Sequence, residues 1–364
     1  MNTETRTSTW IWGTMTAAFL WLFYLHPGES LEAALLGVDI WWHVLLPALL
    51  PFLVMAEILL GFGVVHFIGT LVDPLMRPLF RVPGIGGFVM AMGFASGYPV
   101  AAKLTAQLHS QGLLSRLEST RLVAFCTTSD PIFLIGAVSV GFFGRPELAL
   151  ALAVAHYVGA LLVGIGMRYA GNSDKSQPHL PDNPQVASRA RQVRASLVRR
   201  AFRAMQEAKA ADGRLFGQLL QDALKSALNL ILIIGGLVVF FSVVIALLKQ
   251  AGLVGLMIDS LGWLFRLAGI PLALSPAVVN GLFEVTLGAK SAGAAAADSG
   301  LLAAASLTAF ILSWGGFSVH AQVASLLHGT GVAYRTFLWA RLAHGILAAL
   351  LLLLLWPLFG LVSG

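Results

Sequence analysis

The sequence contains little charge and almost no cysteine. Charged residues make up 11% of its 364 residues and hydrophobic residues 57%, whereas an average soluble chain carries about 25% charged residues. This deficit excludes an ordinary soluble protein and indicates a polytopic membrane protein with long apolar helices. The one cysteine, Cys126, excludes an internal disulfide and a cysteine-rich metal site. Metal-ligand spacings, nucleophile elbows and phosphate-binding loops are absent from suitable contexts, so no enzyme or metalloprotein is predicted.

The positive charge is concentrated in one stretch of the chain. The net charge is +6, and 11 of the 23 lysine and arginine residues lie between residues 168 and 225. A basic stretch between apolar segments is typical of a cytoplasmic loop under the positive-inside rule, and not of a surface that binds nucleic acid. We therefore predict a cytoplasmic linker over 170–226. It contains a basic amphipathic helix over 186–212, which either lies on the anionic leaflet or joins the two halves as a solvated linker.

Apolar segments that can cross a bilayer occur along most of the chain. The candidates are 10–25, 41–66, 121–143, 147–169, 227–249, 303–327 and 336–360. Two further apolar segments, 84–112 and 270–300, are interrupted by glycine, proline, serine and charged residues. Because non-helical backbone at membrane depth must be buried in protein or line a wet cavity, we predict two re-entrant hairpins with inward tips. Residues 1–40 are predicted to form an N-terminal helix and an outer loop.

The two halves of the chain resemble each other. Both hairpin motifs end in Ala-Lys, at Lys103 and Lys290, which are 187 residues apart. Counting sides from the cytoplasmic linker places the start of one repeat, 41–169, outside and the start of the other, 227–364, inside. The fold class predicted is therefore an all-α membrane protein with two inverted-topology repeats, re-entrant hairpins and broken helices. Paired, interrupted apolar segments are the best sequence pointer to the binding site of a secondary transporter.

Several polar residues are predicted at membrane depth. A charge there costs at least about 2.5–3.5 kcal/mol, so it is typically paired, hydrated or functional. Lys103 and Lys290 are candidate ligands of an anion, and snorkelling to the headgroups is an alternative for each. Asp130 and Glu284 are candidates for coupling to a cation. The candidate solute-binding residues are Ser96, Gly97, Tyr98, Lys103, Thr127, Thr128, Ser129 and Asp130 in the first half and Asn280, Glu284, Thr286, Lys290, Ser313, Gly315, Gly316, His320 and Gln322 in the second.

Four motifs carry a resemblance to a known family. They are Phe94-Ala-Ser-Gly-Tyr-Pro-Val-Ala-Ala-Lys103, the segment 118–131, Phe283-Glu-Val-Thr286 and Gly315-Gly-Phe-Ser-Val-His-Ala-Gln322. In these motifs the chain resembles the YlbJ-type sporulation integral membrane proteins of the nucleoside-recognition (Gate) domain group. The segment Thr127-Thr-Ser-Asp130 departs from the Asn-Asn-Ser-Gly that is usual in the group, and this departure leaves the ion and solute preference open.

The resemblance implies a fold similar to that of concentrative nucleoside transporters, in which hairpins and broken helices form a transport domain that moves like an elevator. It also implies a function, namely transport of a small organic anion, dipicolinic acid, across the outer forespore membrane of a spore-forming bacterium. The expected partners are the bilayer, the anion and a further copy of the chain, and the expected coupling ion is sodium or a proton. Two alternatives stay open: transport of a nucleoside or another small solute, and a scaffold for spore assembly that transports nothing.

Overall fold

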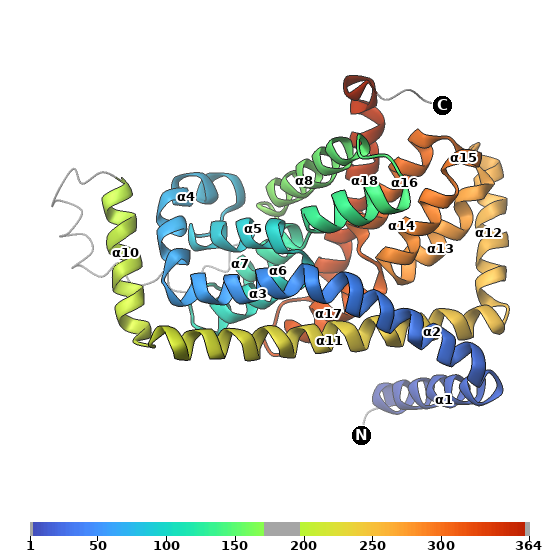
Figure 1. The fold of residues 1–364 in the computed structure, drawn as a ribbon, viewed down its shortest axis with the longest axis horizontal. Helices are drawn as coiled ribbons and strands as arrows, with labels where there is room; N and C mark the ends of the chain where they lie inside the picture. The colour runs from blue at the N-terminus through green and yellow to red at the C-terminus, as the bar shows by residue number, and fades with distance from the viewer. Residues whose placement is uncertain (1–2, 171–196, 361–364) are drawn as a thin grey trace.

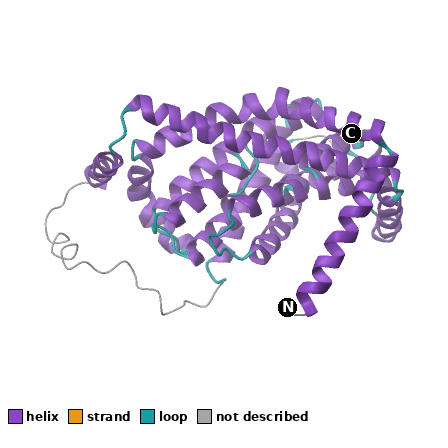
Figure 2. Cartoon of the chain, turned by 90° about the horizontal axis from the view of Figure 1, so that it is seen from below, coloured by secondary structure: helices purple, strands orange, loops and turns teal. Residues whose placement is uncertain are grey.

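The computed structural model describes residues 3–170 and 197–360, and helices connected by short turns make up almost all of this part of the chain (Figure 2). The first half contains α1 (Thr3–Leu25), α2 (Pro27–Ile40), the π-helix η1 (Trp41–Leu45), α3 (Leu46–Gly61), α4 (Val64–Phe80), α5 (Ile85–Ser96), α6 (Tyr98–Ser110), α7 (Arg116–Cys126), the π-helix η2 (Phe133–Phe142) and α8 (Leu148–Met167). The second half contains α10 (Leu197–Asp212), α11 (Phe216–Gln250), α12 (Leu253–Ala268), the short η3 (Leu272–Leu274), α13 (Ser275–Phe283), α14 (Val285–Ala294), α15 (Ala296–Ser299), α16 (Leu301–Trp314), α17 (Gly316–Leu326), α18 (Tyr334–Leu355) and η4 (Trp356–Phe359).

Several of these helices are long and apolar enough to cross a membrane. By length and composition they are α8, α11, the broken pair α16–α17 and the pair α18–η4. Helices α3 and α4 make a fifth candidate only if they count as one span, because they meet at 84°. The expected span 41–66 therefore ends in a sharp turn, where Gly63 adopts a φ of 74°. These helices fit the polytopic membrane protein that the composition indicates.

Residues 27–40 differ from the prediction, because they form helix α2 and not an outer loop. Pro27 stands in the first turn, where its missing N–H costs no hydrogen bond. The helical backbone then continues through η1 into α3 as far as Gly61. Gly37 lets α2 approach α11 closely, since a Cβ there would lie 2.8 Å from the Cα of Val239. The expected loop is thus a packed helix.

Both expected hairpins are present as pairs of short helices. Helices α5 and α6 pack against each other on either side of Gly97, and α13 and α14 do so on either side of Glu284. In the second pair Gly281 and Gly288 allow the closest approach, because a Cβ on Gly288 would lie 2.3 Å from the Cα of Gly281. The order of hairpin, broken helix and terminal helix recurs, with α5–α6, α7–η2 and α8 first and α13–α14, α16–α17 and α18 second.

The linker is described only in part. The predicted helix over 186–212 corresponds to α10, which begins at Leu197, and residues 171–196 lie outside the described residues. Helix α10 packs against α4 through the fully buried Ala201 and an edge-on contact between the rings of Phe67 and Phe202. In Figure 1 it stands at one end of the long helix α11, and α12 stands at the other end.

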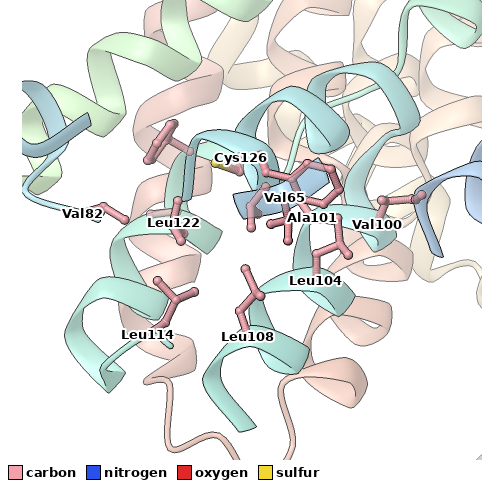
Figure 3. Close-up of a cluster of buried hydrophobic side chains, with 14 of the residues drawn as sticks. Val65, Val82, Val100, Ala101, Leu104, Leu108, Leu114, Leu122 and Cys126 are labelled. Atoms are coloured by element: carbon pink, nitrogen blue, oxygen red, sulfur yellow. The ribbon is translucent and has the colours of Figure 1, made fainter. Parts of the chain in front are cut away.

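Two large apolar cores hold the described helices together. The first core joins α3, α4 and α11 to the first hairpin and α7, and it contains Leu104, Leu108, Leu122 and Cys126 (Figure 3). The second core joins η2, α8, α14, α16, α17 and α18. Helices α6 and α7 contribute to both cores, since each of them presents apolar side chains on opposite faces. The tip of the first hairpin is therefore held where the two cores meet.

Candidate functional site

A cavity of about 510 Å³ lies where residues from both halves of the chain come together. Seven of the predicted solute-binding residues line it, namely Gly97, Tyr98, Ser129, Asp130, Glu284, Thr286 and Gln322. The rest of the wall is mainly apolar and comes from η1, α3, α6, η2, α11, α14 and α17. The tips of both hairpins, the break of the first half and helix α17, which follows the break of the second half, thus contribute to one cavity.

The first hairpin places a tight backbone turn at the cavity wall. Gly97 has a φ of 88° and a ψ of −178°, a conformation that is essentially restricted to glycine. Helix α6 begins directly after it, without a side-chain cap at its N-terminus. The hydroxyl of Tyr98 donates a hydrogen bond of 2.5 Å to the carbonyl oxygen of Leu312 in α16. This bond ties the hairpin of the first half to the broken helix of the second half.

Asp130 starts the helical segment that follows the first break. Its carboxylate accepts a hydrogen bond of 2.8 Å from the backbone N–H of Phe133, as an N-terminal cap does. Pro131 then occupies the first helical position, where a missing N–H is tolerated. A Cβ on Gly97 would lie 3.3 Å from Oδ2 of Asp130, so the carboxylate lies beside the tip of the first hairpin. The break and the hairpin tip form one wall of the cavity.

Glu284 has the same function in the second half. It lies in extended backbone, and its carboxylate accepts bonds from the N–H of Leu287 at 2.8 Å and the hydroxyl of Thr286 at 3.2 Å. Gly316, with a φ of 73°, begins α17 against this tip, because a Cβ there would lie 2.9 Å from the carbonyl oxygen of Phe283. Both carboxylates therefore cap helices at the cavity.

Four helical segments begin at this cavity, and the partial positive charges of their N-termini can be compared with the negative charges of the two carboxylates. They are α6, the segment from Pro131, α14 and α17. Each helix N-terminus carries about +0.5 charge, so four of them supply about +2. When ionised, Asp130 and Glu284 supply two negative charges that offset this. Neither lysine nor arginine occurs among the described residues that line the cavity.

Behind the cavity a buried polar network connects the two helix breaks. His156 of α8 accepts a bond from the backbone N–H of Ser129 through Nε2, at 3.0 Å, and its Nδ1 lies 2.8 Å from the hydroxyl of Ser313. Because Nε2 accepts a hydrogen bond, it carries no proton. The one ring proton is then on Nδ1, which donates it to Ser313, and the ring is neutral. In α18, His344 Nε2 lies 2.7 Å from the carbonyl oxygen of His156, while its Nδ1 accepts from Arg341. Its ring is neutral by the same reasoning.

The remaining predicted residues of the breaks lie near the cavity without lining it. Except for the half-buried Asn280, their side chains are buried, and most are bonded within the fold. Thr127 donates to Val123, Thr128 to Gly93, Ser313 pairs with His156, and His320 lies within bonding distance of Tyr334 and the Trp314 carbonyl. Ser96 is buried at the end of α5 with no hydrogen-bond partner among the described residues. Gly315, with a φ of 88°, forms the break itself, and Asn280 donates to Ser291 within the second hairpin.

The two candidate lysines do not meet at the cavity. Lys103 forms a hydrogen-bonded ion pair with Glu57 of α3, and its Nζ also donates to the hydroxyl of Ser226 in α11 at 2.6 Å. Lys290 is exposed on α14 and lies outside the cavity lining. The reason is geometric, because each lysine lies more than one helical turn after its hairpin tip. An anion in the cavity would therefore meet helix ends and hydroxyl groups in place of these ammonium groups.

Some lining residues were not predicted from the sequence. Ser318 has a buried hydroxyl with no partner among the described residues, and it lies one helical turn before Gln322 on the same face of α17. The i, i+4 spacing of these two residues was an available signal. The apolar wall residues Ile234 and Val238 of α11 carry no such signal, since α11 is apolar along much of its length.

The sequence is similar to a known family and to known proteins. Residues 42–146, which include the first hairpin and the break at Asp130, match the family described as Gate: Nucleoside recognition. The sporulation integral membrane protein YlbJ of Bacillus subtilis is 42% identical over 335 residues, which cover 92% of this chain and 79% of that protein. The chain belongs to the YlbJ family of sporulation integral membrane proteins.

A weaker likeness links this YlbJ-family chain to an uncharacterized protein of Alkalihalophilus pseudofirmus. The two are 25% identical over 148 residues, which cover 41% of this chain and 30% of that protein. No solved structure matches the chain. The likeness to the Bacillus subtilis YlbJ protein, which extends over most of both chains, is therefore the finding that assigns this chain to the family.

Proposed function

We propose that this chain transports a small organic anion, dipicolinate, across the outer forespore membrane during sporulation, and that it catalyses no chemical conversion. The cavity carries this proposal. Its volume of about 510 Å³ falls within the range of about 300–1,000 Å³ that is typical of small-molecule sites. Its wall combines apolar side chains with helix ends and hydroxyl groups, a composition that suits a flat ring with polar substituents. Tyr98 lies in this wall and offers an aromatic face for stacking.

The recurring order of elements supports a transporter. Discontinuous helices whose N-termini converge near mid-membrane are characteristic of the binding sites of secondary transporters. We infer that the two halves have opposite orientations, as the distribution of positive charge along the sequence predicts. We further infer that the hairpins and broken helices move together against α3 and α11, in the manner of an elevator.

The two carboxylates suggest coupling to a cation. Asp130 and Glu284 both line the cavity, and each uses part of its hydrogen-bonding capacity on a helix N-terminus. A bound sodium ion or a proton at either group would reduce its repulsion of a dianion. We therefore propose that the solute and at least one cation bind together.

A second function has an observation in its favour. None of the described lining residues is lysine or arginine, and Thr286, Ser318 and Gln322 offer hydrogen bonds without charge. These features suit a nucleoside or another small neutral solute. A scaffold that transports nothing is less well supported, because it gives no role to a cavity with capping carboxylates and an unpartnered hydroxyl.

The test is a binding assay on the purified protein in detergent. Dipicolinate and a panel of nucleosides are compared by the rise in melting temperature, with and without sodium and across pH. A ligand at 100 times its Kd stabilises the folded state by about 2.7 kcal/mol, which such an assay detects. We expect dipicolinate to raise the melting temperature and to require a cation. A shift with nucleosides alone supports the second function, and no shift with any solute favours the scaffold.

Two serine variants locate the binding site. Ser318→Ala removes an unpartnered hydroxyl from the cavity wall, and Ser306→Ala removes an unpartnered buried hydroxyl elsewhere. Neither hydroxyl has a partner among the described residues, so both proteins are expected to keep the stability of the unliganded parent. Only Ser318→Ala should weaken solute binding. Equal binding by both variants would place the solute away from this cavity.

A further inference from the structure

One charged side chain is completely buried behind the cavity. Arg341 of α18 has 0% exposure, and none of the carboxylates in the described residues forms an ion pair with it. A cation in such a place is costly unless dipoles or an anion compensate it. The guanidinium group donates to the carbonyl and to the hydroxyl of Thr127, the latter at 3.0 Å, and to Nδ1 of His344. Its Nε has no partner among the described residues.

Arg341 is the charged member of the buried network. His156 and His344 have hydrogen-bond patterns that fit neutral rings, and the other members are hydroxyl and backbone groups. Arginine stays protonated in proteins, so its charge persists at every physiological pH. The network therefore holds one permanent positive charge between the two helix breaks.

The charge lies close to the cavity wall. Thr127, which accepts two of its hydrogen bonds, comes two residues before Ser129 and three before Asp130, and both of these line the cavity. Two residues of extended chain span at most about 7 Å. The positive charge thus acts on a bound solute across one layer of protein.

We propose that Arg341 determines the preference of the cavity for anionic over neutral solutes, acting through space and without touching the solute. The four helix ends and the two carboxylates nearly offset one another, so one further charge decides the sign of the potential. This inference rests on the proposed transport function and names the residue behind its charge selectivity. It also gives a reason for a buried cation without a carboxylate partner.

The size of the effect follows from Coulomb's law for two charges that one layer of protein separates. At a separation of about 12 Å and an effective dielectric constant of about 20, two unit charges interact by an amount that corresponds to about a tenfold change in Kd. Each negative charge on the solute should therefore contribute about a tenfold factor. A neutral solute of the same shape should contribute none.

Three solutes of one shape test this dependence on charge. They are pyridine-2,6-dicarboxylate, its monoamide and its diamide, which carry two, one and no negative charges. Their Kd values are measured on the full chain and on Arg341→Met, Arg341→Lys and the control Arg335→Met, which alters an exposed arginine of the same helix. For Arg341→Met we expect losses of about 100-fold, about tenfold and none. Arg335→Met should match the parent.

Arg341→Lys separates charge from structure. Lysine keeps the charge but cannot reproduce the fork of hydrogen bonds that arginine makes. A purely structural role predicts that all three solutes lose affinity equally in both Arg341 variants. Our inference predicts that Arg341→Lys keeps most of the preference for the diacid over the diamide. This comparison can be made even if Arg341→Met does not fold.

The failures of the two proposals can be told apart. A parent protein that does not prefer the diacid to the diamide refutes both the anion transport proposal and this inference. A parent that prefers the diacid, with Arg341→Met keeping the same ratio, refutes this inference alone. If Arg341→Lys folds but loses the preference, the positive charge is not its source and the inference also fails.

Discussion

The ion pair between Lys103 and Glu57 provides the sharpest test of how the first hairpin is attached. Lys103 lies on α6, Glu57 on α3, and the hydroxyl of Ser226 on α11 bonds to both, at 2.6 Å to Nζ of Lys103 and 3.0 Å to the carboxylate of Glu57. Three helices that are distant in the sequence thus share one polar contact. We predict that neutralising either charged member alone costs far more stability than neutralising both.

The magnitude follows from the burial of the pair. Removing one member of a fully buried ion pair costs about 3–5 kcal/mol, because the other charge is left uncompensated. The side chains of Lys103 and Glu57 keep 16% and 13% of their exposure, so water screens part of this cost. We expect about 2–3 kcal/mol for Glu57→Gln or Lys103→Met. The double variant should lose about 1 kcal/mol, so that the coupling energy is negative and exceeds about 2 kcal/mol in size.

The measurement is a double-mutant cycle of unfolding free energies in mixed micelles. Arg77→Met is the matched control, because Arg77 pairs with Asp73 at the surface with 65% of its side chain exposed, and exposed pairs contribute about 0–1 kcal/mol. If the losses of the two single variants add in the double variant, the pair is not coupled. Single variants that are no less stable than Arg77→Met would refute the reasoning as well.

Three further predictions concern the cavity wall and the second helix break. Gly316→Ala should destabilise the protein by more than the about 1–2 kcal/mol of a left-handed alanine, since its Cβ also meets backbone at 2.9 Å. Gly269→Ala, at a left-handed glycine with φ 68° in open space, shows the strain alone, and equal losses of melting temperature in the two variants would contradict this. Glu284→Gln keeps an acceptor for the helix cap, so the melting temperature of this variant should change little. Its solute binding should no longer depend on sodium or pH, and an unchanged dependence would show that the cation binds at another group. Tyr98→Phe should cost about 1 kcal/mol in unfolding free energy through the lost bond to α16, and no loss would show that this bond contributes nothing.

The breaks and hairpins of the fold were predictable because their signals are local. A glycine at position 97, the Asp130-Pro131 step and the Gly315-Gly316 pair each interrupt apolar sequence, and the structure has a break at each of them. The packed helix over 27–40 was not predicted, because this segment was interpreted as the loop that connects the apolar segments 10–25 and 41–66. Its close contact with α11 involves residues about two hundred positions away, which no local pattern reveals.

The arrangement of polar groups was harder to predict. Which of the candidate residues line the cavity depends on the rotation of each helix about its axis, and a pattern of scattered polar residues does not fix this rotation. The partners of Lys103 are 46 and 123 residues away in the sequence. Arg341 is bonded to a carbonyl, a hydroxyl and an imidazole. Its burial could not be predicted from the sequence, because no acidic partner at helical spacing indicates it.

The burial of Cys126 has a practical consequence for studying this chain. Its thiol is the only one in the sequence, and 0% of the residue is exposed. A thiol sealed in an apolar core reacts slowly with maleimides and spin labels, because the reactive thiolate is disfavoured there. The natural chain is thus a ready background for reporter probes, in which one cysteine added at a hairpin tip gives the fluorescence or spin signal of that tip alone.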